Sequence, residues 1–136
     1  LTTWGITKWI GGVLGPVLNP FLSNPVLFVL IFVLLVYLTR FIVISWLGVM
    51  TVYSVLLAPL AVQAGMHPFI PCFIAYVSVN VFFFDFQNLP YVSAIGIVGD
   101  MVDHNKNCVP YAIIWAAANL VACLISVPYW KMIGML

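Results

Sequence analysis

The sequence has 136 residues, of which 65% are hydrophobic and 5% are charged, and its formal net charge is +1. Soluble domains carry about 25% charged residues, so this composition excludes an ordinary soluble domain and predicts an integral membrane protein in the lipid bilayer. A net charge so close to zero gives no basis for binding nucleic acid.

The N-terminal residues 1–22 combine Trp4, Lys8 and Trp9 with several glycines and prolines. Tryptophan and lysine together are typical of the membrane surface, whereas repeated Gly and Pro are unfavourable for a spanning helix. We therefore predict an interfacial or linker segment over residues 1–22. Because the chain begins with Leu and without a signal-peptide pattern, we expect either that something was removed upstream or that this is a piece of a longer chain.

The next region is an apolar stretch from Pro25 to Ala64 that is interrupted by one charge, Arg40. A single crossing takes about 20 residues, so the stretch is too long for one crossing, and it has no polar loop between two. We predict helices over Val26–Leu38 and Trp46–Val62 that form a re-entrant helical hairpin within residues 23–65. Two full crossings, with Arg40 extending to an interface, are the alternative that the sequence leaves open.

Residues 66–136 start within a turn, Gly65–Pro68, and continue into two short apolar segments, Phe69–Phe84 and Tyr91–Val98. Neither segment is long enough to cross a membrane. Between them, Pro90 lacks an N–H group and disfavours helical geometry at the preceding residue. We predict one helix broken near the membrane midplane.

The chain closes with a polar loop and a final spanning helix. Residues 100–107 form the one strongly polar run, and Cys108–Tyr129 is long enough to cross the membrane. Trp130 and Lys131 follow as an interfacial anchor. The predicted fold class is therefore all-α, with a hairpin, a broken helix and a terminal transmembrane helix.

The two predicted breaks hold the candidate site. A broken membrane helix frees carbonyl groups at one half-helix and N–H groups at the next, and transporters use such breaks to hold ions and substrates. Residues suited to coupling a cation or a proton are Asp85, Gln87 and Asn88. Residues suited to binding an anionic substrate are Arg40, Ser45, Asn88, Pro90 and Ser93.

A purely structural interpretation of the same residues is also open. Asp85 and Arg40 could form a buried ion pair, while Gln87 and Asn88 satisfy loose main-chain groups. We expect Asn80 to line the path through the break, and Asn119 to serve in packing between helices.

The sequence offers no pattern for enzymatic chemistry or for a structural metal. It has no GxSxG, HExxH or P-loop motif, so we do not expect an enzyme. Its three cysteines are odd in number and lack a ligand-like spacing to the two histidines, which supports neither a disulfide framework nor a zinc site.

The order of these elements resembles the C-terminal repeat of the divalent anion/sodium symporter family, which contains dicarboxylate, citrate and sulfate carriers. The resemblance runs from about Leu22 to the end and is closest over Leu57–Ile97 and Pro128–Leu136. AGMHPFIP, residues 64–71, is similar to the turn of that family. NLPYVSAIG, residues 88–96, falls where the family has a loop similar to Thr-Pro-Pro-Asn-Ala.

Within that loop, Asn88 stands in the place of the Thr, Pro90 in the place of the second Pro and Tyr91 in the place of the Asn, and Gly96 is kept. At the hairpin tip, where the family carries Ser-Asn-Thr, this sequence reads IVISW, in which Ser45 is the one hydroxyl. The resemblance then assigns Arg40 and Asp85 as replacements, for substrate and for a cation or proton respectively.

The resemblance implies that the chain is one half of an inverted-repeat transporter, completed by a missing N-terminal repeat and assembled as a homodimer. The implied function is secondary active transport of small divalent anions coupled to sodium or to protons. The resemblance implies no cofactor, and sodium is the metal ion that the site would bind. We expect a bacterial or archaeal inner (plasma) membrane. A non-transporting membrane scaffold subunit and a channel remain the alternatives.

Overall fold

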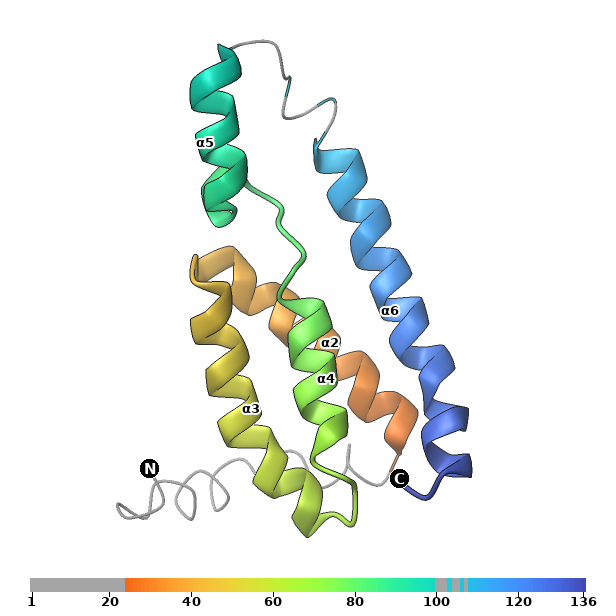
Figure 1. Cartoon of the computed structure of the whole chain (residues 1–136). Helices are drawn as coiled ribbons and strands as arrows, with labels where there is room; N and C mark the ends of the chain where they lie inside the picture. The colour runs from red at the N-terminus through yellow and green to blue at the C-terminus, as the bar shows by residue number, and fades with distance from the viewer. Residues whose placement is uncertain (1–23, 100–102, 104–105, 107) are drawn as a thin grey trace, which may run out of the picture.

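The computed structural model describes residues 24–99, 103, 106 and 108–136. In this part of the chain the secondary structure is helical, with five α-helices and no strand (Figure 1). The predicted segment 1–22 and most of the polar loop 100–107 lie outside the described residues. Three helices are long and apolar enough to cross a membrane, namely α2 (Pro25–Ile42), α3 (Trp46–Gln63) and α6 (Val109–Met132). The all-helical, membrane-compatible architecture is thus confirmed.

The first two helices, α2 and α3, form a helical hairpin with a short tip at residues 43–45, and its re-entry into the membrane stays a prediction. The Asn24 side chain caps the start of α2 by accepting hydrogen bonds from the N–H groups of Val26 (3.2 Å) and Leu27 (3.5 Å). We predicted that this helix ends at Leu38, but it continues to Ile42. The Thr39 hydroxyl donates back to the carbonyl of Leu35 (2.9 Å), so a polar residue at this point does not interrupt the helix.

Helix α3 begins and ends with ordinary capping geometry. The Ser45 hydroxyl accepts a hydrogen bond from the N–H of Gly48 (3.1 Å), which fixes the start of α3 directly after the hairpin tip. At the other end Gly65 has φ = 80°, a conformation that favours glycine, and the Met66 N–H bonds back to the carbonyl of Ala61 (2.8 Å). The chain therefore reverses over the predicted turn 65–68.

The predicted broken helix is present, but its break is wider than expected. Helix α4 (Phe69–Ser78) stops at Ser78 rather than at Phe84, and a short 3₁₀ turn, η2 (Asp85–Gln87), precedes α5 (Leu89–Val98). Apart from Asn80, residues 79–84 are β-branched or aromatic, and such residues are weak helix formers. The prediction of helix up to Phe84 was wrong, because it was based on the hydrophobicity of these residues and not on their weak tendency to form helices.

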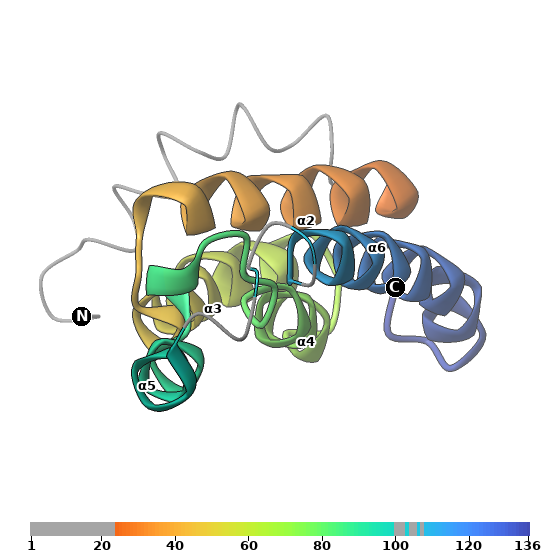
Figure 2. The same ribbon diagram turned by 90° about the horizontal axis from the view of Figure 1, so that it is seen from above.

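Helix α4 lies at the centre of the molecule, with α2, α3 and α6 packed around it (Figures 1 and 2). Its buried residues, Ile70, Pro71, Ile74, Ala75 and Ser78, recur at helical spacing and form one face. The buried residues of α6 include Ala112, Ala116 and Cys123, whose small side chains allow close approach of helices. The C-terminus also packs here, since the Met135 carbonyl accepts the N–H of His67 (2.8 Å).

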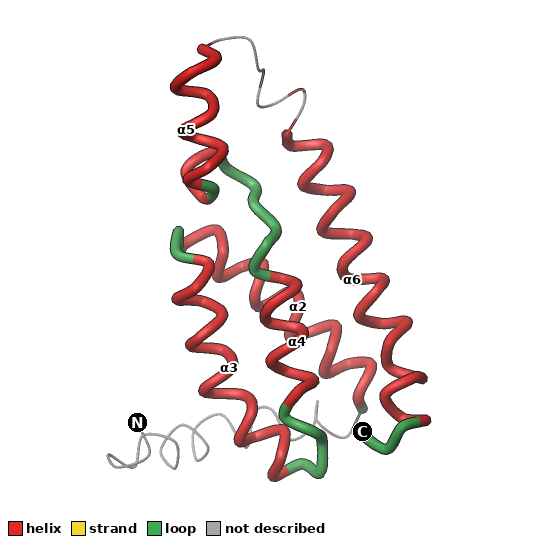
Figure 3. Tube along the Cα trace, in the orientation of Figure 1, coloured by secondary structure: helices red, strands yellow, loops and turns green. Residues whose placement is uncertain are grey.

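Helix α5 extends beyond the tip of the hairpin and has no buried residue (Figures 1 and 3). Its start is fixed by Asn88, whose side chain accepts the N–H of Tyr91 (3.3 Å), and by Pro90 in its first turn. The predicted segment Tyr91–Val98 is helical, and the helix begins two residues earlier, at Leu89. The break between α4 and α5 consequently lies level with the hairpin tip.

Candidate functional site at the hairpin tip

The hairpin tip and the helix break are joined by a reciprocal pair of hydrogen bonds. The Arg40 guanidinium donates through Nη2 to the main-chain carbonyl of Gln87 (3.3 Å), and the Gln87 amide donates through Nε2 to the main-chain carbonyl of Arg40. Each residue thus satisfies a main-chain carbonyl of the other segment. The prediction that the second break faces the first is confirmed by these contacts.

Arg40 also holds the tip itself. Its Nη1 donates to the carbonyls of Val43 (3.0 Å) and Ile44 (2.7 Å), which lie just past the end of α2 and would otherwise have no helical partner. A cation at the C-terminal end of a helix is also favoured by the helix dipole. The side chain is 2% exposed, so this positive charge is buried at the tip.

The acceptors of Arg40 are neutral. Within the described residues its guanidinium hydrogen bonds go to main-chain carbonyls, and none goes to a carboxylate. The buried ion pair with Asp85 that we considered is therefore not what holds Arg40. A buried cation is costly unless it is paired, so its charge makes this junction a favourable place for an anion.

Gln87 satisfies the extended chain between α4 and η2. Its Oε1 accepts the N–H groups of Phe83 (2.6 Å) and Phe84 (3.2 Å), and the side chain is buried. In an apolar membrane layer unpaired N–H groups are strongly unfavourable, so one amide replaces the hydrogen bonds that the missing helix would have made. This contact explains why the break is stable where the sequence is so hydrophobic.

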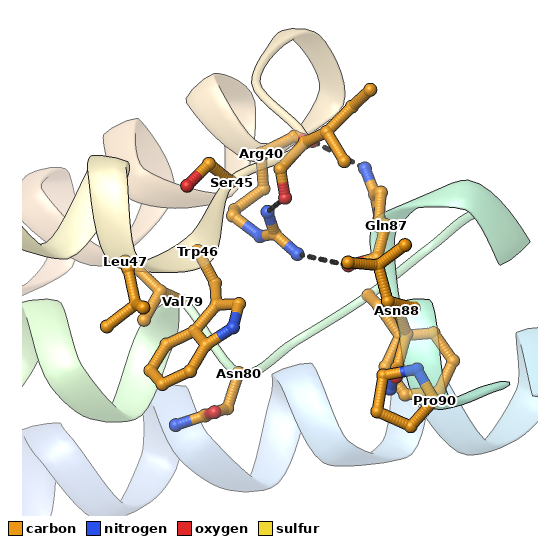
Figure 4. A pocket seen from close by; sticks show the side chains of 12 residues that line it. Arg40, Ser45, Trp46, Leu47, Val79, Asn80, Gln87, Asn88 and Pro90 are labelled. Atoms are coloured by element: carbon orange, nitrogen blue, oxygen red, sulfur yellow. Dashed lines mark hydrogen bonds between the residues drawn. The ribbon is translucent and has the colours of Figure 1, made fainter. Parts of the chain in front are cut away.

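A cavity of about 530 Å³ opens between the tip and the break (Figure 4). Figure 4 shows the Arg40 guanidinium between the indole of Trp46 on one side and the Gln87–Asn88 segment on the other. The cavity wall is made by residues of the tip, the start of α3, the end of α4 and the start of α5: Arg40, Ile44, Ser45, Trp46, Leu47, Val79, Asn80, Phe82, Gln87, Asn88, Leu89 and Pro90.

Five of the predicted site residues share this cavity: Arg40, Ser45, Gln87, Asn88 and Pro90. Ser45 and Asn88 use their side chains as helix caps, so each presents a polar group whose position is fixed by a helix start. Asn80, which we expected on the path, also lines the cavity, and its Nδ2 donates to the carbonyl of Tyr76 (2.8 Å).

Two predicted site residues lie outside the cavity wall. Asp85 is half-buried at the start of η2, where its main-chain carbonyl accepts the N–H of Asn88 (3.1 Å). The Ser93 hydroxyl donates to the carbonyl of Leu89 (2.9 Å) within α5. The structure therefore groups the predicted anion ligands, except Ser93, and separates Asp85 from them.

Most of the apolar part of the cavity wall was not predicted from the sequence. Trp46 and Leu47 are the first two residues of α3 and border the cavity, as do Val79 and Phe82 of the break. A signal for Trp46 was available, because a large aromatic residue directly after the capping Ser45 must lie beside the tip. For Val79 and Phe82 there was none, since their place depends on where α4 ends.

A separate polar cluster lies in the core between α2, α4 and α6. Asn119 donates through Nδ2 to the hydroxyls of Tyr37 (2.9 Å) and Ser78 (3.2 Å), and Tyr37 donates to the carbonyl of Ala116 (2.8 Å). Its members bond to one another and to main chain, which confirms the predicted packing role of Asn119. In the described part of the chain, no group of three or more His, Cys, Asp or Glu side chains gathers to hold a metal.

The chain was compared with known proteins by sequence and by structure. No protein-family model, no curated protein and no solved structure matches the chain.

Proposed function

We propose that this chain is one repeat of a secondary active transporter for small divalent anions, coupled to sodium or to protons, and that the cavity at the hairpin tip is its half of the substrate site. The observation that carries the proposal is Arg40, a buried cation bonded to neutral carbonyls at the wall of that cavity. An arginine fork presents several donors to a carboxylate or a sulfate.

The arrangement of the two breaks supports the same proposal. The tip between α2 and α3 lies level with the break between α4 and α5, and short of the far end of α5 (Figure 1). If α6 spans the bilayer, the tip lies inside the membrane, as in a re-entrant hairpin. Non-helical backbone at that depth is tolerated where it is buried in protein or lines a water-filled cavity.

Coupling to a cation or a proton would use the break. The chain around η2 contributes main-chain carbonyls, Gln87 and the carboxylate of Asp85, all oxygen ligands of the kind that sodium takes. An ionisable residue inside a membrane protein is functional by default, and a carboxylate can also carry a proton. We assign coupling to Asp85 and substrate binding to Arg40, in a homodimer with a second repeat beside this one.

One observation favours a different class of protein, a scaffold subunit without transport. The bonds of Arg40 and Gln87 are also the bonds that purely structural residues would make, because each satisfies main-chain groups at a break. The decisive test therefore changes the charge of the cavity without removing either residue.

Asn80→Asp makes that change, since Asn80 lines the cavity and, among the described contacts, its amide nitrogen bonds only to the carbonyl of Tyr76 in α4. We expect the full-length protein in proteoliposomes to take up succinate, with sulfate and citrate as competitors, under an imposed sodium or proton gradient. A carboxylate in the cavity repels the anion, so Asn80→Asp should raise the half-saturating concentration at least tenfold. Asp85→Asn should remove the dependence on the gradient.

The matched control is Asn24→Asp, the same substitution at the start of α2 and away from the cavity. Asp caps a helix as well as Asn does, so this variant should transport like the wild type. Saturable uptake separates a carrier from a channel. If the folded wild type moves none of the three anions under either gradient, the scaffold interpretation holds and the proposed function is wrong.

A further inference from the structure

The wall of the cavity is divided by chemistry. Its one charged side chain is Arg40, and its other polar side chains, Ser45, Asn80, Gln87 and Asn88, are neutral. The remaining residues are apolar: Ile44, Trp46, Leu47, Val79, Phe82, Leu89 and Pro90. A ligand that matches this wall has an anionic group and, next to it, an apolar surface.

Two of the apolar residues, Trp46 and Leu47, lie across the cavity from the Gln87–Asn88 segment that Arg40 bonds to. Figure 4 shows the guanidinium of Arg40 beside the Gln87–Asn88 segment, while the indole of Trp46 and the side chain of Leu47 lie on the opposite side. Both side chains stay partly exposed, Trp46 by 43% and Leu47 by 56%, although each lies in a hydrophobic chain with ample opportunity for burial. Apolar surface next to a buried cation is what a site for an organic anion requires.

The size of the cavity agrees with that composition. Sites for small organic molecules have volumes of about 300–1,000 Å³, and this cavity has about 530 Å³. A second, smaller cavity of about 130 Å³ shares Asn80 and Phe82 with it and is lined further by Tyr111, Ala112 and Trp115 of α6. A compact hydrated anion such as sulfate would leave most of this apolar surface without a contact.

We infer that the substrate of this site is an organic carboxylate with a bulky apolar group, bound with a carboxylate on Arg40 and the apolar group against Trp46 and Leu47. The inference rests on the proposed transport of small anions and names the substrate class of that same site. It predicts that this protein prefers such substrates over sulfate and unsubstituted dicarboxylates, because the apolar wall contributes to binding only when the anion carries an apolar body.

The test compares three competitors of radiolabelled succinate uptake by the full-length protein in proteoliposomes: sulfate, succinate and 2-phenylsuccinate. We expect 2-phenylsuccinate to inhibit at a concentration at least tenfold below that of succinate, and sulfate to be the weakest. Trp46→Ala should remove this advantage of the phenyl group, and Trp46→Phe should retain most of it.

Leu47→Ala and Leu38→Ala form the matched pair. Both leucines are exposed residues of the hairpin next to its tip, but only Leu47 lines the cavity. Leu47→Ala should therefore reduce the phenyl advantage by about threefold to tenfold, and Leu38→Ala should leave it unchanged. The truncations remove little packing, because each side chain is already substantially exposed.

The outcomes separate this inference from the function on which it rests. If succinate is transported but 2-phenylsuccinate has no advantage, or Trp46→Ala leaves that advantage intact, the apolar wall is covered by lipid or by the rest of the protein and the inference is overturned. If the wild type transports no anion, the proposed function fails and the inference fails with it. A phenyl advantage that depends on Trp46 supports both.

Discussion

The two polar clusters of this chain solve the same physical problem in opposite ways. Buried polar groups in an apolar protein must be paired. The core cluster around Asn119 pairs side chains from three intact helices with one another and with main chain, and it is closed. The tip cluster pairs Arg40 and Gln87 with main chain that two helix breaks have freed, and it borders a cavity.

The difference concerns what remains after pairing. In the core cluster the Asn119 amide meets two hydroxyls, all partners are neutral, and removing one loses a modest interaction. In the tip cluster the hydrogen bonds of Arg40 are satisfied in large part, but its charge is not compensated by them. Polar residues between intact helices are therefore best interpreted as packing, whereas a buried charge at facing breaks indicates a binding site.

The strongest way to break this comparison is to remove the charge at the tip. Arg40→Met leaves the carbonyls of Val43, Ile44 and Gln87 without their donor, and each hydrogen bond to a charged group contributes about 1.5–3 kcal/mol. Because such losses are not additive, we expect the free energy of unfolding to fall by about 3 kcal/mol. Anion uptake should fall more than 100-fold. Unfolding by SDS titration in micelles measures the first effect and proteoliposome uptake the second.

Arg40→Lys is the companion variant, because it keeps the charge but not the fork that bonds several acceptors at once. We expect it to retain part of the stability and to bind the anion more weakly. If Arg40→Met remained fully active in a folded protein, Arg40 would be a structural residue only, and the two clusters would not differ in kind.

The core cluster should respond in the opposite way. Asn119→Leu removes the bonds to Tyr37 and Ser78, and hydrogen bonds between membrane helices contribute about 0.6 kcal/mol on average. We expect the free energy of unfolding to fall by about 1 kcal/mol, with the half-saturating concentration for succinate unchanged. A large loss of uptake at unchanged stability would place Asn119 on the transport path.

Much of the hairpin could be predicted from the sequence, because its signals are local. Asn24 and Pro25 mark the start of α2, Ser45 caps α3, and Pro90 marks the start of α5, each through its own side-chain chemistry. The facing of the two breaks followed from the absence of polar loops in an apolar chain. It needed no knowledge of which atoms meet.

The remainder depends on contacts between distant residues. Val79–Phe84 has the hydrophobicity of a membrane helix, and only the acceptance of two of its N–H groups by the Gln87 amide makes an extended chain favourable there. The place of Asp85 off the cavity wall has a related reason. In a 3₁₀ turn successive side chains are rotated by about 120°, so Gln87 can be buried at the tip while Asp85 lies off the cavity wall.

The smallest predicted effect sharpens the boundary of the tip cluster. Ser93 was a predicted ligand, yet its hydroxyl donates to the carbonyl of Leu89 within an exposed helix and it lies outside the cavity wall. Ser93→Ala removes a hydrogen bond from a side chain to the main chain of its own exposed helix, and such bonds add little to stability. The free energy of unfolding should therefore change by less than about 0.5 kcal/mol. Uptake of succinate should be unchanged, whereas a rise in its half-saturating concentration of tenfold or more would extend the binding site along α5 and require a ligand longer than the cavity now described.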